Sequence, residues 1–126
     1  MPPELIDVDV VHSYARRVGD RVRLVLTLPA DTALEGRRVW VRLVPKHDAE
    51  PFRVSTDLTR DERGWRLEAY AEAASLTPGL WKLWLRVGKG GPLPRLQAVL
   101  LMSDTQPIAL LPGRRTRALM AEPAPR

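Results

Sequence analysis

Residues 76–88, which read LTPGLWKLWLRVG, alternate between two kinds of side chain. One parity is apolar and comprises Trp81, Leu83, Leu85 and Val87. The other parity comprises Lys82, Trp84 and Arg86. Because successive side chains of a β-strand point to opposite faces, this pattern predicts a strand with one buried and one solvated face. The Pro78-Gly79 pair before it predicts a turn.

The same period-two pattern recurs along most of the chain. We expect strands over residues 5–11, 21–28, 38–44, 52–54, 65–72, 80–88, 95–103 and 108–111. Residues 16–20 and 57–64 are expected to be connections, residues 30–36 a connection with space for one helical turn, and Ala73 the site of another short turn of helix. No long segment has helical periodicity. The fold class predicted is therefore all-β, an immunoglobulin-like antiparallel β-sandwich of seven to eight strands.

The length of 126 residues corresponds to one domain, and 44% of the residues are hydrophobic, which is enough for a core. We place the β-sandwich domain at residues 1–112. Residues 113–126 are rich in Pro, Arg and Ala, and we expect a disordered Arg/Pro-rich tail.

The chain contains no cysteine, which excludes disulfides, thiolate zinc sites and thiol nucleophiles. Its first residues carry acids where a signal peptide needs positive charge. The longest strongly apolar run, Ala98 to Met102, is far shorter than the ~20 residues that span a bilayer. We therefore expect a cytoplasmic protein with no membrane span.

The net charge is +5, from 20 basic and 15 acidic residues. The tail supplies much of this excess, since it holds four arginines and a single acid, Glu122. Basic and acidic residues nearly balance over residues 1–112, and the tail arginines have no aromatic residues between them. This distribution argues against nucleic acid as the partner.

Motifs of known catalytic sites are absent from the sequence. It has no GxSxG, Walker or GxGxxG motif. His12 and Ser13 are neighbours in the sequence, and because neighbouring residues on a strand point to opposite faces, we expect no nucleophile–base pair. We expect no enzyme activity, no cofactor and no metal. Asp7, Asp9 and His12 leave open the alternative of a small metal-dependent hydrolase, against the simpler interpretation of a solvated edge strand.

The four tryptophans fall into two pairs. Trp65 and Trp81 share the parity of the inward Leu and Val residues and are predicted to lie in the core. Trp40 and Trp84 have the opposite parity and lie among cations. They could be covered by arginine side chains or by a loop, or they could form a sugar-stacking platform or a protein contact. The candidate ligand or partner surface comprises Trp40, Arg42, Lys82, Trp84 and Arg86.

The segment Pro78 to Val87, PGLWKLWLRV, resembles a strand of β-sandwich accessory domains. These domains are appended to bacterial cell-wall glycosyltransferases and glycerophosphotransferases, and the likeness covers residues 54–88. The resemblance implies a non-catalytic accessory module whose partner is a glycosyltransferase or a sugar polymer, and it implies no catalytic residue. The alternative is a protein–protein interaction module of another pathway, which binds through a sheet edge or face.

Overall fold

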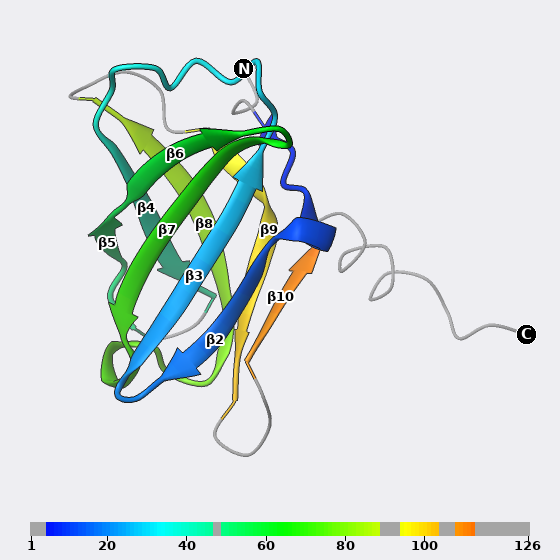
Figure 1. Cartoon of the computed structure of the whole chain (residues 1–126). Helices are drawn as coiled ribbons and strands as arrows, with labels where there is room; N and C mark the ends of the chain where they lie inside the picture. The colour runs from blue at the N-terminus through cyan, green and yellow to red at the C-terminus, as the bar shows by residue number, and fades with distance from the viewer. Residues whose placement is uncertain (1–4, 47–48, 89–93, 104–107, 113–126) are drawn as a thin grey trace, which may run out of the picture.

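The computed structural model describes residues 5–46, 49–88, 94–103 and 108–112, and its described part is all-β (Figure 1). Ten strands form a six-stranded and a four-stranded sheet, consistent with a β-sandwich. The six-stranded sheet runs β1-β9-β8-β4-β5, with β10 also beside β9. Its strands are β1 (Leu5–Ile6), β4 (Val39–Pro45), β5 (Phe52–Ser55), β8 (Gly79–Val87), β9 (Arg95–Met102) and β10 (Ala109–Pro112).

The four-stranded sheet runs β2-β3-β7-β6 and lies in front of the other sheet in Figure 1. Its strands are β2 (Tyr14–Val18), β3 (Arg21–Leu28), β6 (Asp57–Asp61) and β7 (Gly64–Glu72). Two short 3₁₀ helices, η1 (Val10–His12) and η2 (Ala73–Ser75), complete the described elements. The η2 helix confirms the turn of helix expected near Ala73.

The core lies between the sheets and is built from the inward parity of each strand. On β8, Trp81 is 1% exposed and Leu83 is fully buried, while Trp65 on β7 is 7% exposed. The predicted core position of both tryptophans is confirmed. Each indole N–H donates to a loop carbonyl, that of Trp65 to Thr32 at 2.8 Å and that of Trp81 to Thr77 at 2.9 Å. Their polar atoms are therefore satisfied inside the core.

The strand count exceeds the predicted seven to eight because two polar segments pair as strands. A connection was expected over residues 16–20, but residues 14–18 form β2, and all five of them pair with β3. Residues 57–61 form β6 within the expected connection and pair with β7. Both strands lie at an edge of the four-stranded sheet, where one face and one flank are open to water and apolar alternation is not required.

The prediction of a strand over residues 5–11 is wrong beyond Ile6. The chain pairs with β9 only at Leu5 and Ile6, and it does so in parallel, so the sheet is not wholly antiparallel as predicted. It then leaves the six-stranded sheet and forms η1 before entering β2 of the other sheet. Exposed and half-buried side chains still alternate as far as Asp9, although residues 7–9 do not pair with a neighbouring strand.

The chain passes from β5 in one sheet to β6 in the other through a single residue, Thr56. The Thr56 hydroxyl donates to the Val39 carbonyl at 2.8 Å, and its N–H donates to the same oxygen at 3.2 Å. These two bonds fix the corner between the sheets.

Three other expectations concern connections. Residues 30–36 contain no helical turn, although Leu34 from this segment is buried in the core. The predicted turn before β8 is a bend at Pro78, and Gly79, with a φ of 126°, already belongs to the strand. The connection between the strands predicted at residues 80–88 and 95–103, and the predicted tail at 113–126, lie almost wholly outside the described residues.

Candidate functional site

The five residues of the predicted surface lie together on the outer face of the six-stranded sheet. Trp40 and Arg42 stand on β4, and the remaining three stand on β8. Register pairs Trp40 with Arg86 and Arg42 with Trp84. Because all have the parity opposite to the core, their side chains share the outward face. The structure thus brings the predicted residues together.

Trp40 is half-buried, and two guanidinium groups cover its ring. The Arg38 guanidinium carbon lies 5.3 Å from the ring centroid, and that of Arg53 lies 5.4 Å from it. A cation at this distance is attracted by the indole π-system. Of the possibilities left open by the sequence, cover by arginine side chains is the one that the structure contains at Trp40. Its indole is therefore in contact with two cations.

Arg53 is a member of this surface that sequence reasoning missed. It lies on β5, where register places it directly opposite Arg42. Two like charges in direct cross-strand positions repel one another and destabilise a sheet. The alternation of Phe52, Arg53 and Val54 indicated an outward Arg53, but its neighbour could be known only from the strand order.

The arginines surround a hollow of about 260 Å³. Arg42, Arg53 and Arg86 line it together with Pro51 and Phe52. The Phe52 ring packs edge-on against the buried Trp81, with centroids 5.7 Å apart and an interplanar angle of 69°. One wall of the hollow is therefore anchored in the core, while three cations line its opening.

No acidic residue occurs in any strand of the six-stranded sheet. The sheet nevertheless carries five cations, which are Arg42, Arg53, Lys82, Arg86 and Arg95. Within the described ranges none of these five takes part in an ion pair. The strands of this sheet therefore carry five positive charges that no carboxylate of the same strands neutralises.

Lys82 and Trp84 complete the predicted surface along β8. Lys82 lies opposite Val44 of β4 and Val99 of β9, so its charge borders an apolar part of the sheet. Trp84 is half-buried beside Arg42 and Arg95 and, among the described residues, makes no cation–π contact. It is the one of the two outward indoles whose ring is not held by a guanidinium group.

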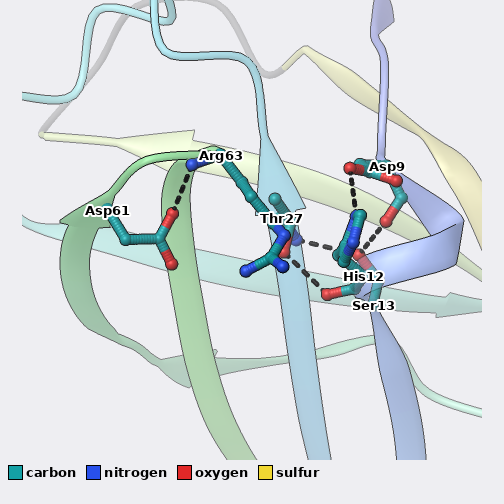
Figure 2. Close-up of polar contacts among 6 residues, drawn as sticks. All are labelled: Asp9, His12, Ser13, Thr27, Asp61 and Arg63. Carbon is teal, nitrogen blue, oxygen red and sulfur yellow. Dashed lines mark hydrogen bonds and ion pairs between the residues drawn. The ribbon is translucent and has the colours of Figure 1, made fainter.

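A second polar cluster lies at η1, the 3₁₀ helix that precedes β2, and involves none of the residues of this surface (Figure 2). Asp9 Oδ2 and His12 Nδ1 are 2.8 Å apart, and the pair is exposed. The hydrogen bond from His12 lowers the pKa of the Asp9 carboxyl below its ordinary value. Asp7 and Asp9 both lie outside any strand, so the interpretation of these acids as part of a solvated edge strand is wrong. Among the described residues no group of three or more His, Cys, Asp or Glu side chains could hold a metal ion.

Comparison with known proteins finds no matching family model, no matching curated protein and no matching solved structure. In the described part of the chain, no helix has the length and apolar character needed to cross a membrane.

Proposed function

We propose that this protein is a non-catalytic binding module that takes an anionic ligand on the outer face of its six-stranded sheet. The observation that carries the proposal is the grouping of Arg42, Arg53 and Arg86 around one hollow, in a sheet whose strands contain no carboxylate. Arg42 and Arg53 stand opposite one another at a cost in stability. An anion seated between them would turn that repulsion into attraction.

The chemistry of the lining favours phosphate, sulfate or carboxylate groups. A guanidinium presents a planar fork of donors that matches such groups with two parallel hydrogen bonds. Trp40 holds Arg53 and thereby reduces the freedom that its side chain loses on binding. Because no acid of the sheet competes for these donors, a ligand need not displace an internal partner.

The resemblance of the Pro78–Val87 segment to accessory domains of cell-wall transferases supports an anionic sugar polymer as the ligand. On that proposal the module works beside a glycosyltransferase and holds its polymer, with Trp84 contacting a sugar ring. An acidic segment of a partner protein satisfies the same charge requirement, and the experiment below separates the two.

We infer that the sandwich is immunoglobulin-like. The sheet order β2-β3-β7-β6 corresponds to strands A-B-E-D of that fold, and β9-β8-β4-β5 corresponds to G-F-C-C′. The buried tryptophan departs from the antibody pattern, since Trp81 stands on the F-like strand and Trp40 on the C-like strand faces outward. A solved structure of a relative with the same strand order would support this inference.

The test compares binding of alginate, a carboxylated polysaccharide, with binding of neutral dextran and of poly-glutamate. Isothermal titration is carried out on the whole chain, on R42Q/R86Q and on R17Q/R37Q. The last variant is a matched control, because Arg17 and Arg37 are exposed and lie outside the hollow. Both doubles remove the same net charge.

We expect alginate to bind and dextran not to bind. Loss of two charge-assisted contacts in R42Q/R86Q is expected to weaken binding by about tenfold or more, while R17Q/R37Q stays close to the parent. Equal weakening in both doubles would reduce the effect to net charge and refute a site. Preference for poly-glutamate over alginate would favour a protein partner instead of a polymer.

A further inference from the structure

The outer face of the four-stranded sheet carries a separate hollow of about 220 Å³. Its floor is formed by Val25 and Thr27 of β3, both of which are buried although they face outward. On one side stands His12 of η1, and on the other stand Arg63 of the β6–β7 turn and Arg66 of β7. Three nitrogen-bearing side chains, from η1, the β6–β7 turn and β7, therefore border one small hollow.

The η1 side of this hollow is fixed by hydrogen bonds of two buried polar residues. Ser13 and Thr27 are the buried polar residues among those described, with exposures of 9% and 4%. The Thr27 hydroxyl donates to the His12 carbonyl at 2.7 Å, and the Thr27 N–H donates to Ser13 Oγ at 2.9 Å. Ser13 Oγ in turn donates to the Asp9 carbonyl. These bonds, drawn in Figure 2, hold η1 against β3 and set the position of His12.

The His12 ring is oriented by Asp9. The carboxylate contacts Nδ1 at 2.8 Å, which leaves Nε2 without a protein partner in the described structure. A carboxylate on Nδ1 fixes the ring and favours a proton on that nitrogen, so Nε2 can donate to an oxyanion only when the ring carries both protons. The lowered pKa of the Asp9 carboxyl is consistent with this arrangement.

The arginines on the opposite side are also unpaired within the described ranges. Neither Arg63 nor Arg66 forms an ion pair. Asp61 borders the hollow as well, but its Oδ1 accepts the Arg63 backbone N–H at 2.8 Å and closes the turn. In Figure 2 the Arg63 guanidinium extends away from the Asp61 carboxylate toward the strand that carries Thr27.

We propose that this hollow is a binding site for a small oxyanion, either a phosphate monoester or a carboxylate, contacted by Arg63, Arg66 and His12. Guanidinium groups recognise both kinds of oxyanion. The volume of about 220 Å³ suits one such group with a small substituent rather than a polymer repeat. This site is independent of the six-stranded sheet and does not rest on the function proposed for that face.

The experiment is a titration of the ¹⁵N-labelled whole chain with inorganic phosphate and, separately, with acetate, followed by NMR. Binding is expected to shift the amide signals of residues 9–13, Thr27 and residues 61–66. R63Q is expected to weaken the binding by about tenfold, and R63K is expected to restore part of it, because a charge returns without the fork. R17Q, which removes a charge elsewhere on the same sheet, is the control.

R63Q changes an exposed turn residue and leaves the Asp61–Arg63 backbone bond in place, so folding is retained. The H12N variant tests the contribution of His12, which stands on the opposite side of the hollow from Arg63. Shifts confined to residues outside the hollow, or equal weakening by R63Q and R17Q, would overturn the proposal. Shifts with phosphate but not acetate would assign the phosphate monoester, and the reverse would assign the carboxylate. R42Q/R86Q is expected to bind phosphate here like the parent, which separates this site from the other face.

Discussion

In the four-stranded sheet, Arg23 of β3 donates to Glu68 of β7 at 3.0 Å, whereas in the six-stranded sheet Arg42 of β4 stands opposite Arg53 of β5. The strands of the first sheet hold four acids, Asp57, Asp61, Glu68 and Glu72, interspersed with arginines. The strands of the second hold none. Two sheets that share one core therefore differ in how their outer charges are compensated. The difference teaches that part of the charge on the first face is paired across strands, as in Arg23–Glu68, whereas the cations in the strands of the second sheet form no ion pair among the described residues.

We expect the inner faces of the two sheets to contribute equally to the free energy of unfolding. Substitutions there should have the largest effects on stability. W81A and W65A each remove a buried indole and its hydrogen bond, one from each sheet. We expect each to lower the free energy of unfolding by about 3–5 kcal/mol, measured by urea denaturation. An effect below about 1 kcal/mol for either variant would mean that the two sheets do not share the core equally.

E68Q tests the compensated face. The hydrogen bond from Arg23 lowers the pKa of the Glu68 carboxyl, so the ionised group stabilises the folded chain above the ordinary pKa of a glutamate. That stabilisation is lost as the pH falls through the lowered pKa of the folded state. We expect E68Q to cost about 0.2–1 kcal/mol near neutral pH and nothing in strong acid, measured by denaturation across the pH range.

Glu35 provides a matched control for that titration, since it is exposed in a loop and lies outside every ion pair of the described residues. E35Q should leave stability unchanged at every pH. A cost of E68Q that persists undiminished in acid would show that charge is not the reason for it.

R42T tests the uncompensated face, and its expected effect on stability is of similar size to that of E68Q but has the opposite sign. It removes one of two facing like charges and introduces a residue that favours strands. We expect a gain of about 0.2–1 kcal/mol in the free energy of unfolding at low salt. The gain should shrink as salt screens the repulsion. The comparison of the two sheets fails if R42T destabilises the protein as E68Q does.

Period-two alternation was sufficient to predict strands such as β3, β7 and β8, because the inward parity of each is buried, apart from Gly79 and Val87 at the ends of β8. The core positions of Trp65 and Trp81 follow from the same rule. The alternation rule did not predict β2 and β6, because they lie at sheet edges and bury few side chains. For Tyr14–Val18, two adjacent arginines also interrupt the alternation.

The candidate surface was predicted in part for a related reason. Parity placed Trp40 and Trp84 on an outer face, but it could not say which strands are neighbours. The pairing of β4 with β5 places Arg53 against Trp40. This contact joins two strands, so no local sequence pattern could predict it. The hollow at η1 likewise depends on the departure of the chain from β1, since a continuous strand would have turned His12 and Asp9 to a different side.

The corner at Thr56 has a consequence for how this chain can change in length. With one residue between β5 and β6, an added or deleted residue there would reverse which side chains of β6 meet the core. The segment between Pro29 and Arg38 has no such constraint on parity, apart from keeping Leu34 in place. We therefore expect insertions and deletions in relatives of this protein to occur in that longer segment and not at the corner.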